Sequence, residues 1–473
     1  MPCVPYSFRG PHRHGKIFPH KPDATFFTRH RRWFIGGGIV LLCLAVGLVV
    51  GLKMAEPQLT AYIEGDSFRE ELNKQTSKGL NFKGEYGKIV RTGFDTAWAD
   101  SFQASDGVKA MKSLKATDIS AKFNPGGFFR RWWELDYIHI KRGEVEVQTY
   151  EPQPEEKPDR PWYAIFMPYR VQLNGVVCDW ADVKWRMSGK EAGIYGTTVN
   201  ILPYGTDFEY MAYGGKLNTH GLAPTLDLRS LHLIITKTFL RVVDFVVVPE
   251  GQEKASIRLT GEMGMRDNKH VDFTLEVDDV AIAPWLPSEV SADVAGRATG
   301  HVRWIADEQT IEASGGDGEL TVSGGKLANL PMLGFLASAA ANASLKTISL
   351  KECRVTFQWT YPRFEISDLD IVAVEKVALK GSVVLDKGQL SGTLQLGLDP
   401  EYLKWLPKAE DEIFTKREKG MIWTTVRLSG TLAQPKDDLT PRLTAALKKD
   451  PAAAAGLLLR EAGEWIKQKI KRD

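Results

Sequence analysis

Side chains that could carry out acid–base, nucleophilic or metal chemistry are scattered along this chain of 473 residues. Five histidines follow residue 52, and none belongs to a recognisable metal-binding or catalytic motif. They are His139, His220, His232, His270 and His301. The acidic pairs Asp278–Asp279 and Asp437–Asp438 are typical of turn and cap residues, with a paired-carboxylate site as the alternative interpretation.

Motifs that bind cofactors or activate nucleophiles are absent from the sequence. There is no Gly-x-Ser-x-Gly elbow, no phosphate-binding loop, no dinucleotide fingerprint and no His-Glu-x-x-His pair. The four cysteines lack metal-ligand spacing, and only Cys178 and Cys353 could form a disulfide outside a membrane. The sequence leaves open whether they pair. We therefore predict a protein that is not an enzyme and binds no cofactor or metal, with a membrane-bound hydrolase as the remote alternative.

Residues 33–52, WFIGGGIVLLCLAVGLVVGL, contain no charged side chain. A helix of this length spans about 30 Å, the thickness of the hydrocarbon core of a bilayer. Lys53 follows where a signal peptidase needs small residues, so we predict an uncleaved transmembrane anchor rather than a signal peptide. The predicted anchor residues include Trp33, Phe34, Ile35, Leu41, Leu42, Leu44, Leu48 and Leu52. Gly47 and Gly51 could bring two such helices together as a homodimer, or simply face lipid.

Charge on either side of this anchor predicts the topology. Residues 1–32 carry seven Lys or Arg side chains and one Asp, with Arg29, Arg31 and Arg32 next to the anchor. Basic flanks stay in the cytoplasm, so the N-terminus should be cytoplasmic and the bulk of the chain outside. The whole chain is +2 and this head is +6, which leaves about −4 for the remainder. A mildly acidic bulk argues against a nucleic-acid partner.

Apolar and polar residues alternate along most of the chain after residue 79, which predicts a mainly β protein. No amphipathic helix of ordinary length interrupts the run, so an antiparallel sheet is favoured over βαβ units. We predict a hairpin that turns at Arg142–Gly143. Roughly 22–26 strands spaced about 4.8 Å apart would give a sheet on the order of 110 Å long.

The region 316–400 predicts antiparallel strands with one apolar face. A second sheet could cover this face, or lipid acyl chains could fill a trough formed by it. A short helix is expected within residues 331–343. The predicted groove residues are Val355, Phe357, Trp359, Phe364, Ile366, Val377, Leu379, Leu394, Leu396 and Leu398.

Two similar segments indicate an internal repeat. One passes through Trp285-Leu286-Pro287 and the other through Trp405-Leu406-Pro407. Each reads as a strand, a short helical crossover, a loop and a strand. The C-terminal residues 439–473 have helical apolar spacing with lysines at the end, which suits an interfacial helix or a helix that plugs the sheet.

The segments DGELTVSGGKLANLPMLGFL, ISLKECRVTFQW, FEISDLDIVAVEKVALKGSVVLDKGQLSGTLQLGL and VRLSGTLAQPKDDLTPRL resemble the C-terminal region of the AsmA-like family of bacterial envelope proteins. The basic head, single anchor and β-rich remainder are also similar to that family, which is related to the repeating β-groove lipid-transfer proteins. The resemblance implies a long curled sheet that forms a groove for lipid, and a role in phospholipid movement or outer-membrane upkeep.

These observations together predict five regions. They are a cytoplasmic head (1–32), an inner-membrane anchor (33–52), an N-terminal periplasmic β region (53–275), an AsmA-like β region (276–438) and a C-terminal amphipathic helix (439–473). Phospholipid and the inner membrane are the expected partners. The alternative function is a non-enzymatic assembly factor of the envelope that binds protein partners.

Overall fold

The computed structural model describes Val46 and residues 56–58, 60–80, 82–107, 111–124, 132–148, 170–187, 189–205, 207–219, 224–265, 269–286, 291–308, 310, 312–328, 330–339 and 342–450. The chain divides into two units, residues 1–68 and 69–473. The predicted anchor lies outside the described residues except for Val46, which is helical. Among the residues that are described, we find no helix both long enough and apolar enough to span a bilayer.

The first unit contributes a short helical stretch after residue 56. The Thr60 hydroxyl donates to the Glu56 carbonyl oxygen at 2.9 Å, and the rings of Tyr62 and Phe68 meet edge to face with centroids 5.6 Å apart. Helix α2 (Asp66–Leu80) begins in this unit and continues into the second. In the second unit the Asn73 side chain accepts from the Tyr86 amide at 2.8 Å, which fastens the helix to the first strand.

The second unit contains one sheet of 23 strands. Its N-terminal strands are β1 (Lys83–Tyr86), β2 (Ile89–Arg91), β3 (Thr96–Ser105), β4 (Met111–Asn124), β5 (Trp132–Val147), β6 (Arg170–Leu173), β7 (Val176–Met187), β8 (Lys190–Tyr204), β9 (Asp207–Tyr213), β10 (Lys216–Asn218), β11 (Leu226–Ile235) and β12 (Phe239–Pro249). The remainder are β13 (Ser256–Gly264), β14 (Val271–Ala281), β15 (Val294–Ala306), β16 (Ser314–Ala328), β17 (Thr347–Thr360), β18 (Arg363–Ala373), β19 (Val377–Asp386), β20 (Gln389–Leu398), β21 (Lys416–Glu418), β22 (Met421–Gly430) and β23 (Pro435–Asp437).

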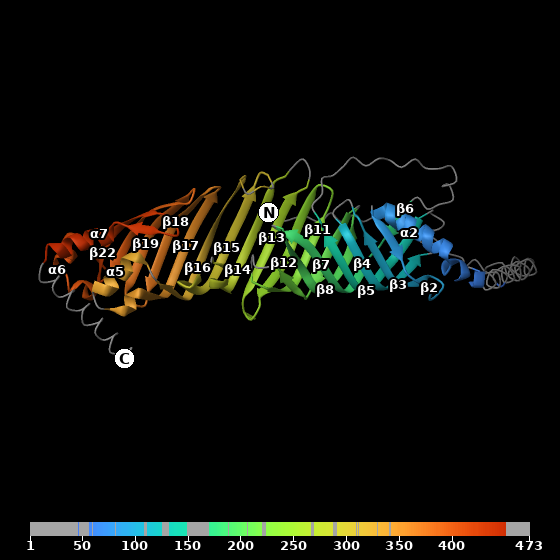
Figure 1. The fold of residues 1–473 in the computed structure, drawn as a ribbon, viewed down its shortest axis with the longest axis horizontal. Helices are drawn as coiled ribbons and strands as arrows, with labels where there is room; N and C mark the ends of the chain where they lie inside the picture. The colour runs from blue at the N-terminus through green and yellow to red at the C-terminus, as the bar shows by residue number, and fades with distance from the viewer. Residues whose placement is uncertain are drawn as a thin grey trace, which may run out of the picture. The chain divides into compact units, whose positions relative to one another are not determined.

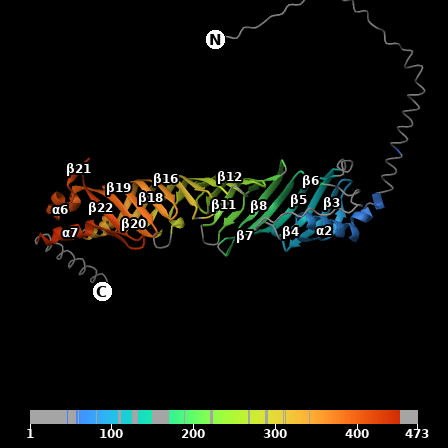
Figure 2. The ribbon, with the colours of Figure 1, turned by 90° about the horizontal axis from the view of Figure 1, so that it is seen from above.

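Strands that follow one another in the chain mostly lie beside one another in the sheet (Figures 1 and 2). Antiparallel pairing runs without a break from β7 through β8, β9 and β11 to β20, and then to β22. The exception among the described strands is β5, which pairs in parallel with β6 and β7. The prediction of a mainly β chain is therefore confirmed. The sheet is mixed, because the two pairs that β5 makes are parallel, and the other described pairs are antiparallel because adjacent strands need only short turns to pair in that way.

One predicted turn is wrong. Gly143 lies within the 16-residue strand β5, opposite Ala116 on β4 and Ala181 on β7. A Cβ at this position would lie 3.1 Å from the Cys178 sulfur, tighter than ordinary packing. The glycine therefore makes room for a side chain of the neighbouring strand. Close approach of another group is a common reason for a glycine inside a strand.

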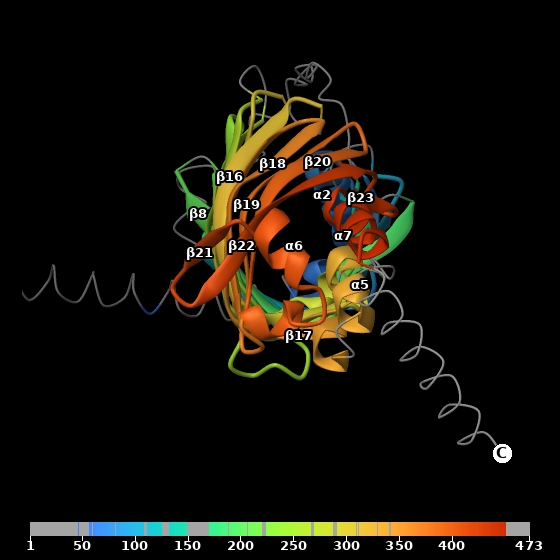
Figure 3. The ribbon, with the colours of Figure 1, turned by 90° about the vertical axis from the view of Figure 1, so that its left-hand side faces the viewer.

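Five short helical segments gather at the C-terminal end of the sheet. They are α5 (Pro331–Ala339), η3 (Ala343–Lys346), η4 (Pro400–Leu403), α6 (Pro407–Glu412) and α7 (Leu439–Lys448). Seen from this end, β16 to β22 curve around α6, and α5 and α7 lie across the open side of the curve (Figure 3). The helix expected within 331–343 is confirmed by α5. The predicted C-terminal helix is present over α7, and its part beyond residue 450 lies outside the described residues.

The internal repeat is also present in the structure. β14 leads into the 3-10 helix η2 (Ala283–Trp285) and then to β15, and β20 leads through η4 and α6 to β22. β14 pairs antiparallel with β15, and β20 pairs antiparallel with β22, which in the second copy follows the three-residue strand β21. The boundary predicted at residue 275 falls within β14, and strand pairing continues on both sides of it.

Charged side chains pair with one another across strands on the face of the sheet that points away from the apolar side chains. Arg303 and Asp272 are 2.7 Å apart, Lys184 and Glu144 are 2.7 Å apart, and similar pairs join other strands. The hydrogen bond from Arg303 lowers the pKa of Asp272 below its ordinary value. Opposite charges at facing positions stabilise a sheet modestly. The sheet thus has one charged face and one apolar face.

Candidate functional site

The apolar face is continuous from strand to strand. Following the register from each strand to the next gives two parallel rows of side chains, which we call row A and row B. Row A consists of Ala97, Ala121, Ile138, Val176, Ile201, Tyr210, Leu233, Val242, Gly261, Phe273, Trp304, Gly316, Trp359, Phe364, Leu385 and Leu390. Row B consists of Ile89, Ala99, Ile119, Ile140, Cys178, Val199, Ala212, Leu231, Phe245, Leu259, Leu275, Val302, Gly318, Phe357, Ile366, Val383, Gly392 and Leu428.

Neither row contains a charged side chain. The alternation of side chains along a strand places the charged residues between row positions on the opposite face, as with Arg303 between Val302 and Trp304. Leaving such a surface in water is unfavourable, because burying apolar surface lowers the free energy by about 25 cal/mol for each Å². Something apolar must therefore cover it.

Protein covers the C-terminal end of the face. Leu336 of α5, Leu403 of η4 and Leu443 of α7 are fully buried against Leu396 and other side chains of the sheet. This cluster includes five of the ten predicted groove residues. They are Val377, Leu379, Leu394, Leu396 and Leu398, each 4% exposed or less. We therefore assign these five to a protein core rather than to a groove, because helices already occupy the space above them.

The middle of the face is more open. Trp304 and Phe364 of row A are 40% and 36% exposed, although large apolar side chains on the inside of a protein are usually buried. Other row residues here are buried against their neighbours in two smaller clusters. Ala212 of row B belongs to one, and Val242 and Phe273 of row A belong to the other. Their members come from strands, apart from Ala255 in a turn, so no described helix takes part in them.

Aromatic side chains concentrate where the open part of the face meets the covered part. The rings of Phe357 and Trp359 have centroids 6.2 Å apart with 26° between their planes, and those of Phe357 and Phe364 are 5.4 Å apart at 28°. On the neighbouring strands, Phe273 and Trp304 are 6.1 Å apart at 32°. These geometries are those of offset, nearly parallel rings.

Glycines of β16 allow two of these rings to lie across the sheet. A Cβ on Gly316 would overlap the outer edge of the Trp359 indole, and a Cβ on Gly318 would lie 2.6 Å from Cζ of Phe357. Both glycines face the aromatic residue directly in the register of β16 and β17. The rings therefore extend over the next strand rather than away from the sheet.

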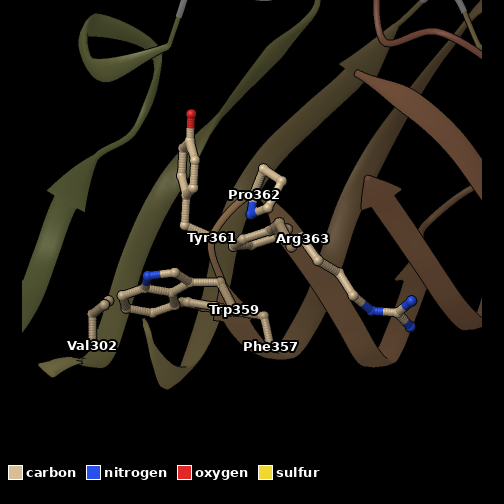
Figure 4. A pocket seen from close by; sticks show the side chains of 7 residues that line it. Val302, Phe357, Trp359, Tyr361, Pro362 and Arg363 are labelled. Atoms are coloured by element: carbon tan, nitrogen blue, oxygen red, sulfur yellow. The ribbon is translucent and has the colours of Figure 1, made fainter. Parts of the chain in front are cut away.

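These aromatic residues line an open pocket of about 390 Å³. The lining consists of Val302, Phe357, Trp359, Tyr361, Pro362, Arg363 and Phe364. Figure 4 shows the Trp359 indole extending towards Val302, with Tyr361 standing beside it and the Arg363 side chain directed away from both. Arg363 donates to Glu365 at 2.9 Å. The volume falls in the range of small-molecule sites, which run from about 300 to 1,000 Å³.

Sequence reasoning identified part of this pocket and missed the rest. The predicted groove residues Phe357, Trp359 and Phe364 line the pocket. Ile366 lies opposite Phe357 in the register, and Val355 packs against the C-terminal core cluster. Val302 was missed because it reaches the pocket from β15, and Tyr361 and Pro362 because they belong to a turn. The apolar residues of rows A and B before β16 could also have been predicted, because each lies in a strand where apolar and polar side chains alternate.

The two cysteines that could have met are both free and buried. They belong to β7 and β17, which are separated by many strands of the sheet. Burial raises the pKa of the Cys353 thiol to about 11 and also raises the pKa of Cys178. Neither thiol has the lowered pKa of a reactive cysteine.

Several of the other residues that could have done chemistry have structural partners within the described part of the chain, and His220 lies outside it. His139 lies 2.9 Å from Asp179, and His232 lies 3.1 Å from Glu209. Among the acidic pairs, Asp279 binds Arg297, and Asp437 and Asp438 accept from the backbone amides of Thr440 and Arg427. The interpretation as cap residues is confirmed at the start of α7, where Asp437 accepts from Thr440 and Asp438 is the N-cap residue. It is wrong for Asp278 and Asp279, which lie within β14 at a register shift and not in a turn. In the parts of the chain that the structure describes, no three His, Cys, Asp or Glu side chains could hold a metal ion together.

No protein-family model, curated protein or solved structure matches this chain. The resemblance to the AsmA-like family therefore stays a prediction from the sequence, and the site must be interpreted from its own geometry.

Proposed function

We propose that this chain binds phospholipids by their acyl chains along rows A and B, and that it transfers lipid without catalysing a reaction. The observation that carries the proposal is the length of the two rows, which continue through most strands of the sheet without a charged side chain. A site for one small ligand would need only a few strands. A continuous apolar surface suits a chain-like apolar ligand that can occupy or move along many positions.

The proposed location is the periplasmic side of a bacterial inner membrane. It is based on the apolar segment 33–52 and on the basic head, whose positive charge favours a cytoplasmic N-terminus. The resemblance to the AsmA-like family favours the same arrangement and a role in maintaining the outer membrane. Close approach of two anchors through Gly47 and Gly51 belongs to this proposal as a secondary element.

Site-specific photo-crosslinking in the full chain tests the proposal. A photoreactive benzoylphenylalanine replaces Leu275 of row B, and in a matched variant it replaces the adjacent Thr274, which points to the other face and is similarly half-buried. A second pair uses Ile140 of row B and its neighbour Lys141. After irradiation in cells, mass spectrometry of the purified chain identifies what was captured.

We expect lipid adducts at Leu275 and at Ile140 and few at Thr274 and Lys141. Equal capture on both faces would mean ordinary contact with a membrane surface and would overturn the proposal. Capture of peptide instead of lipid at the row positions would favour the alternative, an assembly factor that binds protein partners.

A further inference from the structure

The pocket at the turn between β17 and β18 differs from the rest of the apolar face in the side chains that form its surface. Elsewhere the rows are mostly branched aliphatic side chains such as Leu231, Leu233 and Leu275. Here the floor is aromatic: the rings of Phe357 and Trp359 reach across β16 over Gly318 and Gly316, and the Phe364 ring stacks on Phe357 with 28° between their planes.

The aromatic floor depends on a specific local sequence. Gly316 and Gly318 lie directly opposite Trp359 and Phe357, and any larger residue there would push the rings up from the sheet. An acyl chain gains equally good contact from leucine and valine, so it does not need such a floor. A rigid, flat molecule can stack on an aromatic ring, a contact that leucine and valine do not offer.

The electrostatic character of the pocket favours an uncharged ligand. The charged residue in its lining is Arg363, whose guanidinium is paired with Glu365 at 2.9 Å and is directed away from the rings (Figure 4). A charged group of a ligand would lose water contacts against the remaining apolar lining and gain no partner there. Tyr361 stands beside the indole, and its hydroxyl can bond one carbonyl or hydroxyl group of a ligand.

We propose that this pocket is a binding site for a lipid that carries a flat, uncharged ring system, such as an isoprenoid quinone or a polycyclic terpenoid. The proposal rests on the proposed function only in that such a lipid would reach the pocket along the apolar face. The ring lies on Trp359 and Phe357, Val302 limits it on one side, and its apolar tail continues along row A or row B.

Photolabelling of the purified full chain tests this site with three probes. They are a photoactivatable sterol, a photoactivatable ubiquinone analogue and a phosphatidylcholine with the photoreactive group in one acyl chain. Labelled peptides are identified by mass spectrometry. We expect both ring probes to label the peptides that contain Val302 and residues 357–364 in preference to the rest of the sheet, and phosphatidylcholine to label many row positions evenly.

Substitutions then separate the floor from the general apolar face. Trp359→Leu should lower labelling by the ring probes about three- to tenfold, the contribution of an aromatic contact, and leave phosphatidylcholine labelling unchanged. Phe364→Leu is a second variant at a more exposed position and should act in the same direction. The control is Trp285→Leu, because it makes the same substitution as Trp359→Leu at a tryptophan that belongs to η2 outside this pocket, and its 39% exposure is close to the 36% of Phe364.

Each outcome decides between the two proposals. If phosphatidylcholine labels the pocket as strongly as the ring probes and Trp359→Leu lowers all three equally, the pocket is an ordinary part of the acyl surface and the ring proposal is overturned. Absence of ring labelling at these peptides overturns it as well. If the ring probes label the pocket while phosphatidylcholine labels no row position, the ring site stands and the proposed lipid path fails.

Discussion

The apolar face of this sheet is covered by helices at its C-terminal end, whereas no described helix covers it in the middle. At the end, Leu396 is fully buried beneath α5, α6 and their neighbours. In the middle, Trp304 continues the same pattern of alternation but is 40% exposed. The strands are paired antiparallel in both regions, with one register shift between β15 and β16 and none between β19 and β20. What distinguishes the two regions is the presence of helices at one of them.

The difference separates what holds the sheet together from what the sheet can bind. Where helices supply the second layer, the apolar face behaves as the core of a domain, and its side chains contribute to stability. Where no described helix lies on the face, the same residue types remain available to a ligand. An open antiparallel sheet of this length is stable only because its ends or edges are protected, and the helical cover protects the C-terminal one.

The largest effect is expected on the free energy of unfolding when one leucine from each region is replaced by alanine. Leu396→Ala should lower the free energy of unfolding by about 2–5 kcal/mol, because it leaves a cavity beneath packed helices. Leu233→Ala, in the half-buried part of row A, should cost about 1 kcal/mol or less, since ligand or water can fill the space. Urea denaturation followed by circular dichroism measures both.

The contrast between the two variants is what matters in that experiment. A conservative Leu396→Met variant controls for loss of shape and should cost less than about 1.5 kcal/mol. Equal losses for Leu396→Ala and Leu233→Ala would show that the middle of the face is as firmly covered as the end, and the distinction drawn above would fail.

Cysteine reactivity gives the next largest contrast. Burial raises the pKa of Cys353 to about 11, so at pH 8 only about 0.1% of it is thiolate, against roughly a quarter of an ordinary thiol. Alkylation of Cys353 should therefore be at least a hundredfold slower than that of a free thiol. The rate should rise about tenfold for each pH unit up to pH 10, because deprotonation limits it.

Cys178 serves as the comparison within the same molecule. Its pKa is also raised by burial, but it belongs to row B, where only strand residues surround it. Iodoacetamide labelling resolved by peptide mass spectrometry should find Cys178 modified before Cys353. The reverse order would mean that the helical cover opens more readily than the strands of the middle region move.

The sequence predicts the strands and the short helix well, because apolar–polar alternation and turn formation depend on residues that are close together in the sequence. The strands of region 316–400 and the helix within 331–343 are found in the structure. The parallel pairing of β5 with β7 could not be predicted in this way, since the two strands are joined by a segment of more than twenty residues. Gly143 was misread as a turn because glycine also serves close packing between strands.

The candidate site was only half predictable for the same reason. The alternation that identified Phe357 and Leu396 says which face each side chain occupies, and both are indeed on the apolar face. It does not say which part of that face a helix will cover, because docking of α6 and α7 is a tertiary event. Exposure, and with it availability to a ligand, is decided at that step.

A smaller effect is expected from loosening the helical cover. Arg442 of α7 donates to the carbonyl oxygens of Thr425 and of Asp438, the latter at 3.2 Å, and so attaches the helix to the edge of β22. Arg442→Ala should lower the free energy of unfolding by about 1–2 kcal/mol, since hydrogen bonds of a charged donor are lost at a partly exposed site.

The same variant sharpens the comparison if lipid capture is measured as well. With α7 loosened, a photoreactive group at Leu428 of row B should capture more lipid than it does in the unaltered chain. Arg442→Lys keeps the charge but loses the forked geometry of the guanidinium. Its lipid capture should lie between those of the unaltered chain and of Arg442→Ala. Unchanged capture together with lowered stability would mean that α7 stabilises the end without restricting access to it.

The smallest effect is expected on the charged face, which both regions share. Removing the ion pair between Arg303 and Asp272 by Asp272→Asn should change stability by less than about 1 kcal/mol, because the two side chains remain 48% and 34% exposed. The pKa of Asp272 is lowered by Arg303, so this contribution is present at neutral pH and lost as the pH falls through that lowered value. Unfolding at pH 7 and pH 3 in low and high salt measures it, and lipid capture at Leu275 should not change. Loss of lipid capture in this variant would tie ligand binding to the charged face, and the assignment of the two faces to separate roles would have to be abandoned.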